Sequence, residues 1–157
     1  MTYPADTTVR ERILADVESC LAAIAPPAFK LSLSAANVRR WDGNAFHTNS
    51  NLAAVVIPMG EDHDDGRLGV VQHTMSLLLV LGVRARDWST RLQDFIADVR
   101  LALTKDATAW TRGGIALTTQ VVSDRVFDST GSDPVAEAHL NVRILYRTAY
   151  ADPTTPL

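Results

Sequence analysis

The sequence VVQHTMSLLLVLGVRAR, residues 70–86, decides the fold of this chain. Successive side chains of an extended strand point to opposite faces of a sheet, so alternate positions share a face. One face is almost wholly apolar and carries Val71, His73, Met75, Leu77, Leu79, Leu81, Val83 and Ala85. The other face is polar at both ends and apolar in the middle, at Leu78 and Val80. The pattern therefore predicts a long central strand that must be covered on both sides.

Two amphipathic helices are predicted, one before this strand in the chain and one after it. After it, apolar residues recur at spacings of three and four, which is typical of a helix with one buried face. They are Trp88, Leu92, Phe95, Ile96, Val99 and Leu103, and Asp87 is placed to cap the exposed N–H groups. Before the strand, Thr8 and Glu11 have the spacing of a capping box, and the helix that they open should end before Pro26 and Pro27.

The remaining segments complete an α+β fold. We expect a short strand at residues 29–33, a loop at 36–50, a buried strand at 52–57 and an acidic loop at 59–69. Two closing strands, at 115–127 with a bulge near Val121 and at 136–146, should pair antiparallel through the turn sequence DSTGSDP. The prediction is a mainly antiparallel sheet with two packed helices, in the order α-β-β-β-α-β-β. We expect a single domain over residues 1–157, with a flexible tail at about 149–157.

Composition excludes several classes of function. A net charge of −3 argues against a broad surface for nucleic acid, so specific nucleic-acid binding is not expected. The single cysteine, Cys20, rules out an internal disulfide. The strongest apolar run, residues 75–83, has about half of the roughly 20 residues that a membrane-spanning helix needs. We therefore expect no membrane partner.

The acidic segment EDHDDG, from Glu61 to Gly66, is the most conspicuous cluster of ligand-type side chains. The carboxylates and imidazole of Glu61, Asp62, His63 and Asp64 are donors that a divalent cation can use, but their spacing does not match an EF-hand. Consecutive residues also point in divergent directions, which favours a solvated loop over a metal site. A small metal- or ligand-binding α+β enzyme that uses the loop from Glu61 to Asp65 remains the alternative.

No catalytic residue or cofactor follows from the other motifs. The four histidines, His47, His63, His73 and His139, lie on different predicted elements and share no ligand spacing. The sequence Arg112-Gly113-Gly114 lacks the lysine and hydroxyl residue of a phosphate-binding loop, and no serine lies in a nucleophile-elbow sequence.

Polar side chains on the long strands are the candidates for an interface. Arg84 and Arg86 follow the central strand, and Arg143 and Arg147 lie on the polar side of the last one, so that the four predict a basic patch. The competing interpretation is that they are ordinary charges on wet faces. Together with two neighbours on the last strand, the candidate interface residues are Arg84, Arg86, Glu137, His139, Arg143 and Arg147.

Three segments, in this order, cover most of the chain. They are an opening helix, VRERILADVESCLAAI, a central strand VVQHTMSLLLVLGVRA that runs into WSTRLQDFIADVRLAL, and a closing hairpin, TTQVVSDRVFDSTGSDPVAEAHLNVRILYRT. In this organisation, with its proline-containing tail, the chain resembles the tail terminator, or tail completion, proteins of long-tailed bacteriophages and prophages. The likeness is one of organisation, and no exact motif transfers residue by residue.

The resemblance implies an α+β structural protein of the virion that forms a hexameric ring. Such a ring caps the tail tube when the tube reaches its final length, and it offers the surface that the filled head joins. The implied partners are further copies of the chain, a tail tube protein and a head-completion or connector protein. It also implies location in the virion tail, assembly in the bacterial host cytoplasm, no cofactor and no turnover. The polar hairpin face and the acidic loop are then candidate surfaces for ring contacts or for docking to the tube.

Overall fold

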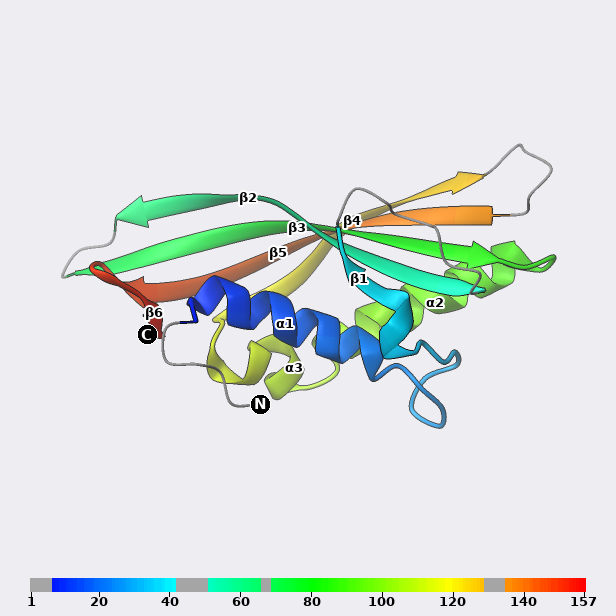
Figure 1. Ribbon diagram of the computed structural model, residues 1–157, viewed down its shortest axis with the longest axis horizontal. Coiled ribbons are helices and arrows are strands. Elements are labelled where there is room, and N and C mark those ends of the chain that lie inside the picture. The colour runs from blue at the N-terminus through cyan, green and yellow to red at the C-terminus, as the bar shows by residue number, and fades with distance from the viewer. Residues whose placement is uncertain (1–6, 42–50, 66–68, 129–134) are drawn as a thin grey trace.

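The computed structural model, which describes residues 7–41, 51–65, 69–128 and 135–157, has the predicted α+β fold (Figure 1). The helices are α1 (Val9–Ala22), η1 (Ala35–Asn37), α2 (Trp88–Thr104), α3 (Ala107–Trp110) and η2 (Arg112–Gly114). The strands are β1 (Val38–Arg40), β2 (Leu52–Asp65), β3 (Val70–Arg84), β4 (Thr118–Asp128), β5 (Val135–Ala149) and β6 (Asp152–Pro156). Within these ranges they form a single sheet in the order β1-β2-β3-β5-β4, and β6 also pairs with β5. Only β1 and β2 run parallel, so the mainly antiparallel sheet is confirmed.

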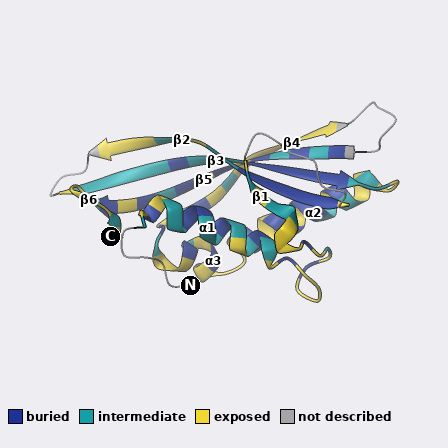
Figure 2. Ribbon diagram, viewed as in Figure 1, coloured by how far each residue is buried: buried dark blue, intermediate teal, exposed yellow. Residues whose placement is uncertain are grey.

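The central strand β3 pairs antiparallel with β2 along one edge and with β5 along the other. Helices α1 and α2 lie one after the other along the same face of the sheet (Figure 1). The alternating apolar residues of β3 and β5 meet the apolar stripes of both helices there, and the buried positions gather at this layer (Figure 2). The largest members of this core include Ile13, Leu21, Met75, Leu77, Leu79, Leu81, Leu92, Phe95 and Leu103.

The prediction of a short strand at residues 29–33 is wrong, because a side chain of α2 accepts hydrogen bonds from the backbone N–H groups of this segment. The carboxylate of Asp98 on α2, buried in the protein, accepts the backbone N–H groups of Lys30 at 3.2 Å and Leu31 at 2.8 Å. These donors are therefore satisfied without a neighbouring strand. The first strand after α1 is instead β1, inside the expected loop at 36–50, of which residues 42–50 lie outside the described part.

The expected acidic loop at 59–69 is a strand as far as Asp65, because β2 continues through it. The N-terminal half of β3 needs partners for its backbone N–H and C=O groups, and β2 supplies them down to the pair Asp65↔Val71. Charged side chains suit this position, since they discourage further pairing at an edge strand. Residues 66–68 lie outside the described ranges.

The predicted N-terminal cap is present in α1 and absent from α2, and the closing strands pair as predicted. The Thr8 hydroxyl accepts the N–H of Glu11 at 3.2 Å, which confirms the cap of α1. Asp87 stands at the start of α2, but its side chain makes no capping bond and instead pairs with Arg91 at 3.3 Å. Strands β4 and β5 pair antiparallel, and the register shifts between Val121 and Ser123, so the predicted pairing and bulge are confirmed.

Three short elements before β4 and after β5 were not predicted. Helices α3 and η2 lie in the segment between α2 and β4. Strand β6 lies in the expected tail at 149–157, where it pairs with β5 at Thr148 and Ala149. Residues 129–134 of the connecting turn lie outside the described ranges. Among the described helices, none combines the length and apolarity needed to cross a membrane.

Asp98 provides a test of how the segment after α1 is held. Asp98→Ala should lower the free energy of unfolding by about 3 kcal/mol, because two backbone donors lose a charged acceptor. Urea denaturation measures the change. The control is Asp94→Ala, which removes the ion pair with the exposed Lys30 side chain and should cost less than about 1 kcal/mol. Equal losses in the two variants would contradict the role of Asp98.

Candidate functional site

Three ligand-type side chains, Glu61, His63 and His73, converge at the end of the sheet where β2 and β3 form a hairpin. His63 and His73 lie directly opposite each other on the two strands. Their Nδ1 atoms are 2.8 Å apart, and Glu61 Oε1 lies 3.1 Å from His73 Nδ1 and 3.5 Å from His63 Nδ1. All three donor atoms therefore face a common point.

A bulge in β2 brings Glu61 and His63 to the face that the helices cover. Before the bulge, the even-numbered residues of β2 pair with core positions of β3, as in Val56↔Leu79. The register shifts between Pro58 and Gly60, so one extra residue, Met59, is inserted. Beyond it the odd-numbered residues, among them Glu61 and His63, share the face of the core.

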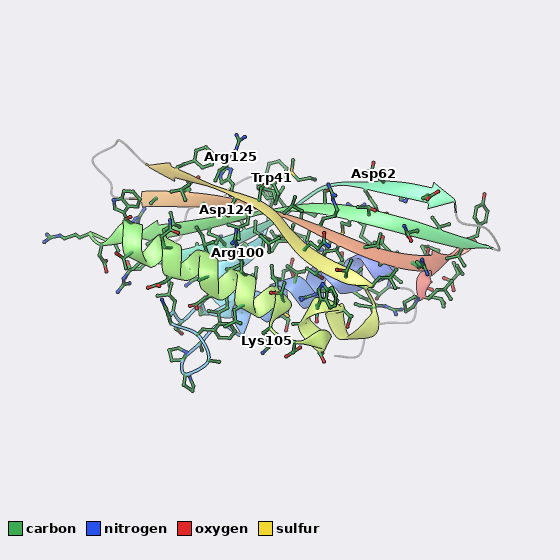
Figure 3. The ribbon with its side chains drawn as sticks, turned by 180° about the vertical axis from the view of Figure 1, so that it is seen from behind. Trp41, Asp62, Arg100, Lys105, Asp124 and Arg125 are labelled. Atoms are coloured by element: carbon green, nitrogen blue, oxygen red, sulfur yellow. The ribbon has the colours of Figure 1, made fainter. Side chains whose placement is uncertain are left out.

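The same alternation sends Asp62 and Asp64 to the opposite face. Figure 3 shows Asp62 on the side of β2 away from the helices. The four residues of the predicted metal-binding alternative are thus divided, with Glu61 and His63 in the cluster and the two aspartates outside it. His73, which the sequence places among core positions, supplies the third ligand. The signal was the Glu-x-His spacing of a strand, which identifies a site only once the hairpin register sets His73 opposite His63.

Residues of β5 hold the two least exposed members of the cluster. His73 Nε2 lies 2.8 Å from the Thr148 hydroxyl, and the His73 ring stacks on that of Tyr146 at 4.5 Å between centroids. The Tyr146 hydroxyl donates to Glu61 Oε2 at 2.7 Å. Burial, and then the hydrogen bond to Glu61, raise the pKa of Tyr146 above its ordinary value. The phenol therefore remains a proton donor to Glu61 at neutral pH.

Burial and charge differ across the cluster. The side chains of Glu61 and His73 are only 8% and 11% exposed, whereas that of His63 is 55% exposed. Among the described residues, Arg10 of α1 forms an ion pair with the cluster, and its Nε lies 4.0 Å from Glu61 Oε2. The site is thus a carboxylate and an imidazole held in the protein, with a second imidazole at the solvent boundary. Such a donor set can share protons or bind a cation.

Among the described residues, His139 is the one further histidine, and it does not join this cluster. His139 lies on β5, on the face away from the helices. Its ring packs at a tilt on that of Phe127, 4.4 Å between centroids, and its Nε2 lies 3.6 Å from Glu137. His47 is outside the described residues.

The arginines among the candidate interface residues do not gather into one patch. Arg84 ends β3 and Arg86 follows it, whereas Arg143 and Arg147 pair with Ser76 and Gln72 further down the sheet. At about 3.3 Å per residue, Arg143 lies roughly 25 Å from Arg84 along the strands, and Arg147 roughly 40 Å. Arg147 also donates to the Gln72 side chain at 3.2 Å. Glu137 and His139 occupy the stretch between the two pairs.

Comparison with known proteins adds no functional assignment. No protein-family model matches the chain, and no curated protein matches it significantly.

A substitution at Tyr146 measures how much its hydrogen bond to Glu61 contributes to stability. Tyr146→Phe keeps the stacked ring but removes the hydroxyl that donates to Glu61, so it should lower the free energy of unfolding by about 2 kcal/mol. Thermal and urea unfolding measure the loss. Tyr150→Phe is the matched control, since Tyr150 is 67% exposed, and it should change stability by less than about 0.5 kcal/mol. No difference between the variants would refute the hydrogen bond.

Proposed function

We propose that the protein is a structural protein of a bacteriophage tail that assembles into a ring, caps the tail tube and offers the surface that the head joins. Its partners are further copies of the chain, the tail tube protein and a head-completion or connector protein. It works in the virion tail after assembly in the host cytoplasm, as an assembly protein without turnover. This proposal is supported by the order of segments in which the chain resembles the tail terminator proteins. The expectation of a hexameric ring also comes from that resemblance.

The observation that carries the proposal is the second face of the sheet. The described helices lie on the other face, so nothing helical among the described residues covers this one (Figure 1). Its middle is apolar, because Val55 pairs with Val80 and Ile57 pairs with Leu78 in adjacent rows. Val55 and Val80 are buried, whereas Ile57 and Leu78 keep partial exposure.

Exposed aromatic residues extend this apolar surface. Trp41, at the end of β1, is 58% exposed and lies on the side of the sheet away from the helices (Figure 3). Phe127, near the end of β4, is 44% exposed and packs on His139 of the second face. Tryptophan and phenylalanine are enriched in protein interfaces, and polar residues such as Asn141 and Arg143 surround the strip as a rim does.

The dimensions of the sheet suit contacts with a neighbouring subunit. Strands β2, β3 and β5 have 14 or 15 residues each, which corresponds to about 45–50 Å. Helices α1 and α2 have 14 and 17 residues, or about 21–26 Å. The sheet therefore presents a surface much longer than either helix, and a second copy that covers it would bury the partly exposed Leu78.

Leu78 is the position that tests ring formation. The wild-type chain should form a ring at high concentration or when tube protein is added. Leu78→Arg should reduce it to a monomer, because the substitution places a charge in the apolar strip. Light scattering measures the mass, and electron microscopy with the tube protein shows whether a ring caps the tube.

Ser89→Arg is the charge-matched control, since Ser89 is exposed on α2, in the layer on the other side of the sheet. It should leave the ring intact, and circular dichroism checks that both variants are folded. A wild-type chain that stays strictly monomeric at high concentration, and forms no ring with tube protein, would refute the proposal. A ring that binds connector proteins but not the tube would assign the chain to another part of the neck.

A further inference from the structure

When both imidazoles are neutral, the Glu61, His63 and His73 cluster has too few protons for the three atoms that meet in it. The Glu61 carboxylate is only an acceptor, and each neutral imidazole has one nitrogen that donates and one that accepts. At 2.8 Å, one of the two facing Nδ1 atoms must donate to the other. If His63 donates, the lone pair of His73 Nδ1 is directed at the carboxylate oxygen only 3.1 Å away. If His73 donates, a single proton is shared between His63 and Glu61.

A metal cation at the common point satisfies all three atoms at once. We propose that Glu61, His63 and His73 bind one divalent transition-metal ion of the zinc class through Glu61 Oε1, His63 Nδ1 and His73 Nδ1. A tetrahedral ion with ligand distances of about 2.0–2.1 Å separates its ligand atoms by about 3.3 Å. The observed separations of 2.8, 3.1 and 3.5 Å bracket that value. The exposed His63 side chain supplies the small adjustment needed.

The hydrogen bonds behind the ligands are those of a metal site. A histidine that binds metal through one nitrogen usually donates the other N–H to a nearby oxygen, which fixes its tautomer. His73 Nε2 lies 2.8 Å from the Thr148 hydroxyl, which can accept its N–H and thereby leave the lone pair of Nδ1 toward the common point. The second oxygen of Glu61 is occupied by the Tyr146 hydroxyl, and Oε1 is left for the ion. The two imidazole planes stand at 88°, so both rings reach the point without overlapping.

The donor set selects the class of ion. Two imidazole nitrogens and one carboxylate oxygen suit zinc, cobalt and nickel, whereas calcium and magnesium prefer oxygen ligands alone. Asp62 and Asp64, which would add oxygens, lie on the other face of β2. Three protein ligands leave the fourth tetrahedral position open, and the 55% exposure of the His63 side chain places that position at the solvent boundary. Water or a group from another protein would fill it.

A titration of the metal-free chain with zinc chloride tests the site. Calorimetry should give one zinc ion per chain, and zinc should raise the melting temperature, because the site exists only in the folded state. Cobalt chloride should produce the visible absorption of a four-coordinate ion. His63→Ala should weaken zinc binding at least about 10-fold, since even the loss of a residue behind a ligand typically costs 10- to 100-fold. His63 is largely exposed, so this variant should fold.

Two neighbours serve as controls. Asp62 lies in the same strand as His63 but on the opposite face, and His139 lies away from the cluster, so Asp62→Ala and His139→Ala leave its ligands in place. Both should bind zinc as the wild type does, whereas Thr148→Val should weaken binding about 10-fold while all three ligands remain. Absence of zinc binding by the wild type would overturn the proposal, as would unchanged binding in His63→Ala. The readout needs only the single chain, so its outcome is independent of ring assembly.

Discussion

The fold depends on the pairing of β3 along both of its edges. Over residues 71–83 the strand exchanges backbone hydrogen bonds with β2 on one side and β5 on the other. A slip of either neighbour by one residue would turn its apolar side chains away from the core, so burial locks both registers. Helices α1 and α2 then pack where these registers gather apolar side chains. The positions of the cluster and of the second face are both consequences of this pairing.

The bulge at Met59 decides which side chains of β2 face the core side at one end of the sheet. If Met59 were paired regularly and β2 had no bulge, the alternation of β2 would continue unchanged, and Asp62 and Asp64 would face the core side in place of Glu61 and His63. The bulge instead sets a carboxylate and an imidazole opposite His73, with Thr148 and Tyr146 behind them. The arrangement is supported from three strands, which makes it more rigid than a surface loop of the same composition.

Charged groups inside the protein tie the helices to the segments around them. The guanidinium of Arg112, which is 1% exposed, donates to Asp16 at 3.1 Å and to Cys20 Sγ at 3.3 Å on α1, and also to the carbonyl of Leu103 on α2. Asp98 holds the segment after α1 in the same way. These contacts keep the helical layer on one face. The other face, with its partly exposed Leu78, carries none of the described helices.

The sequence by itself determined the two long helices and their apolar faces, the central strand, the antiparallel pairing of the closing strands and the bulge near Val121, because hydrophobic period and turn residues are local properties. It also showed that Leu78 and Val80 needed cover. Tertiary structure alone decided the rest. No strand forms at 29–33, because Asp98 accepts the backbone N–H groups of Lys30 and Leu31. Asp98 is 68 positions from Lys30 and 67 from Leu31 in the sequence. The acidic segment became a strand because β3 offered it an unpaired edge, and His73 met Glu61 and His63 only through the hairpin register. Contacts between distant residues have no local pattern, and for that reason the cluster could not be read from the chain in order.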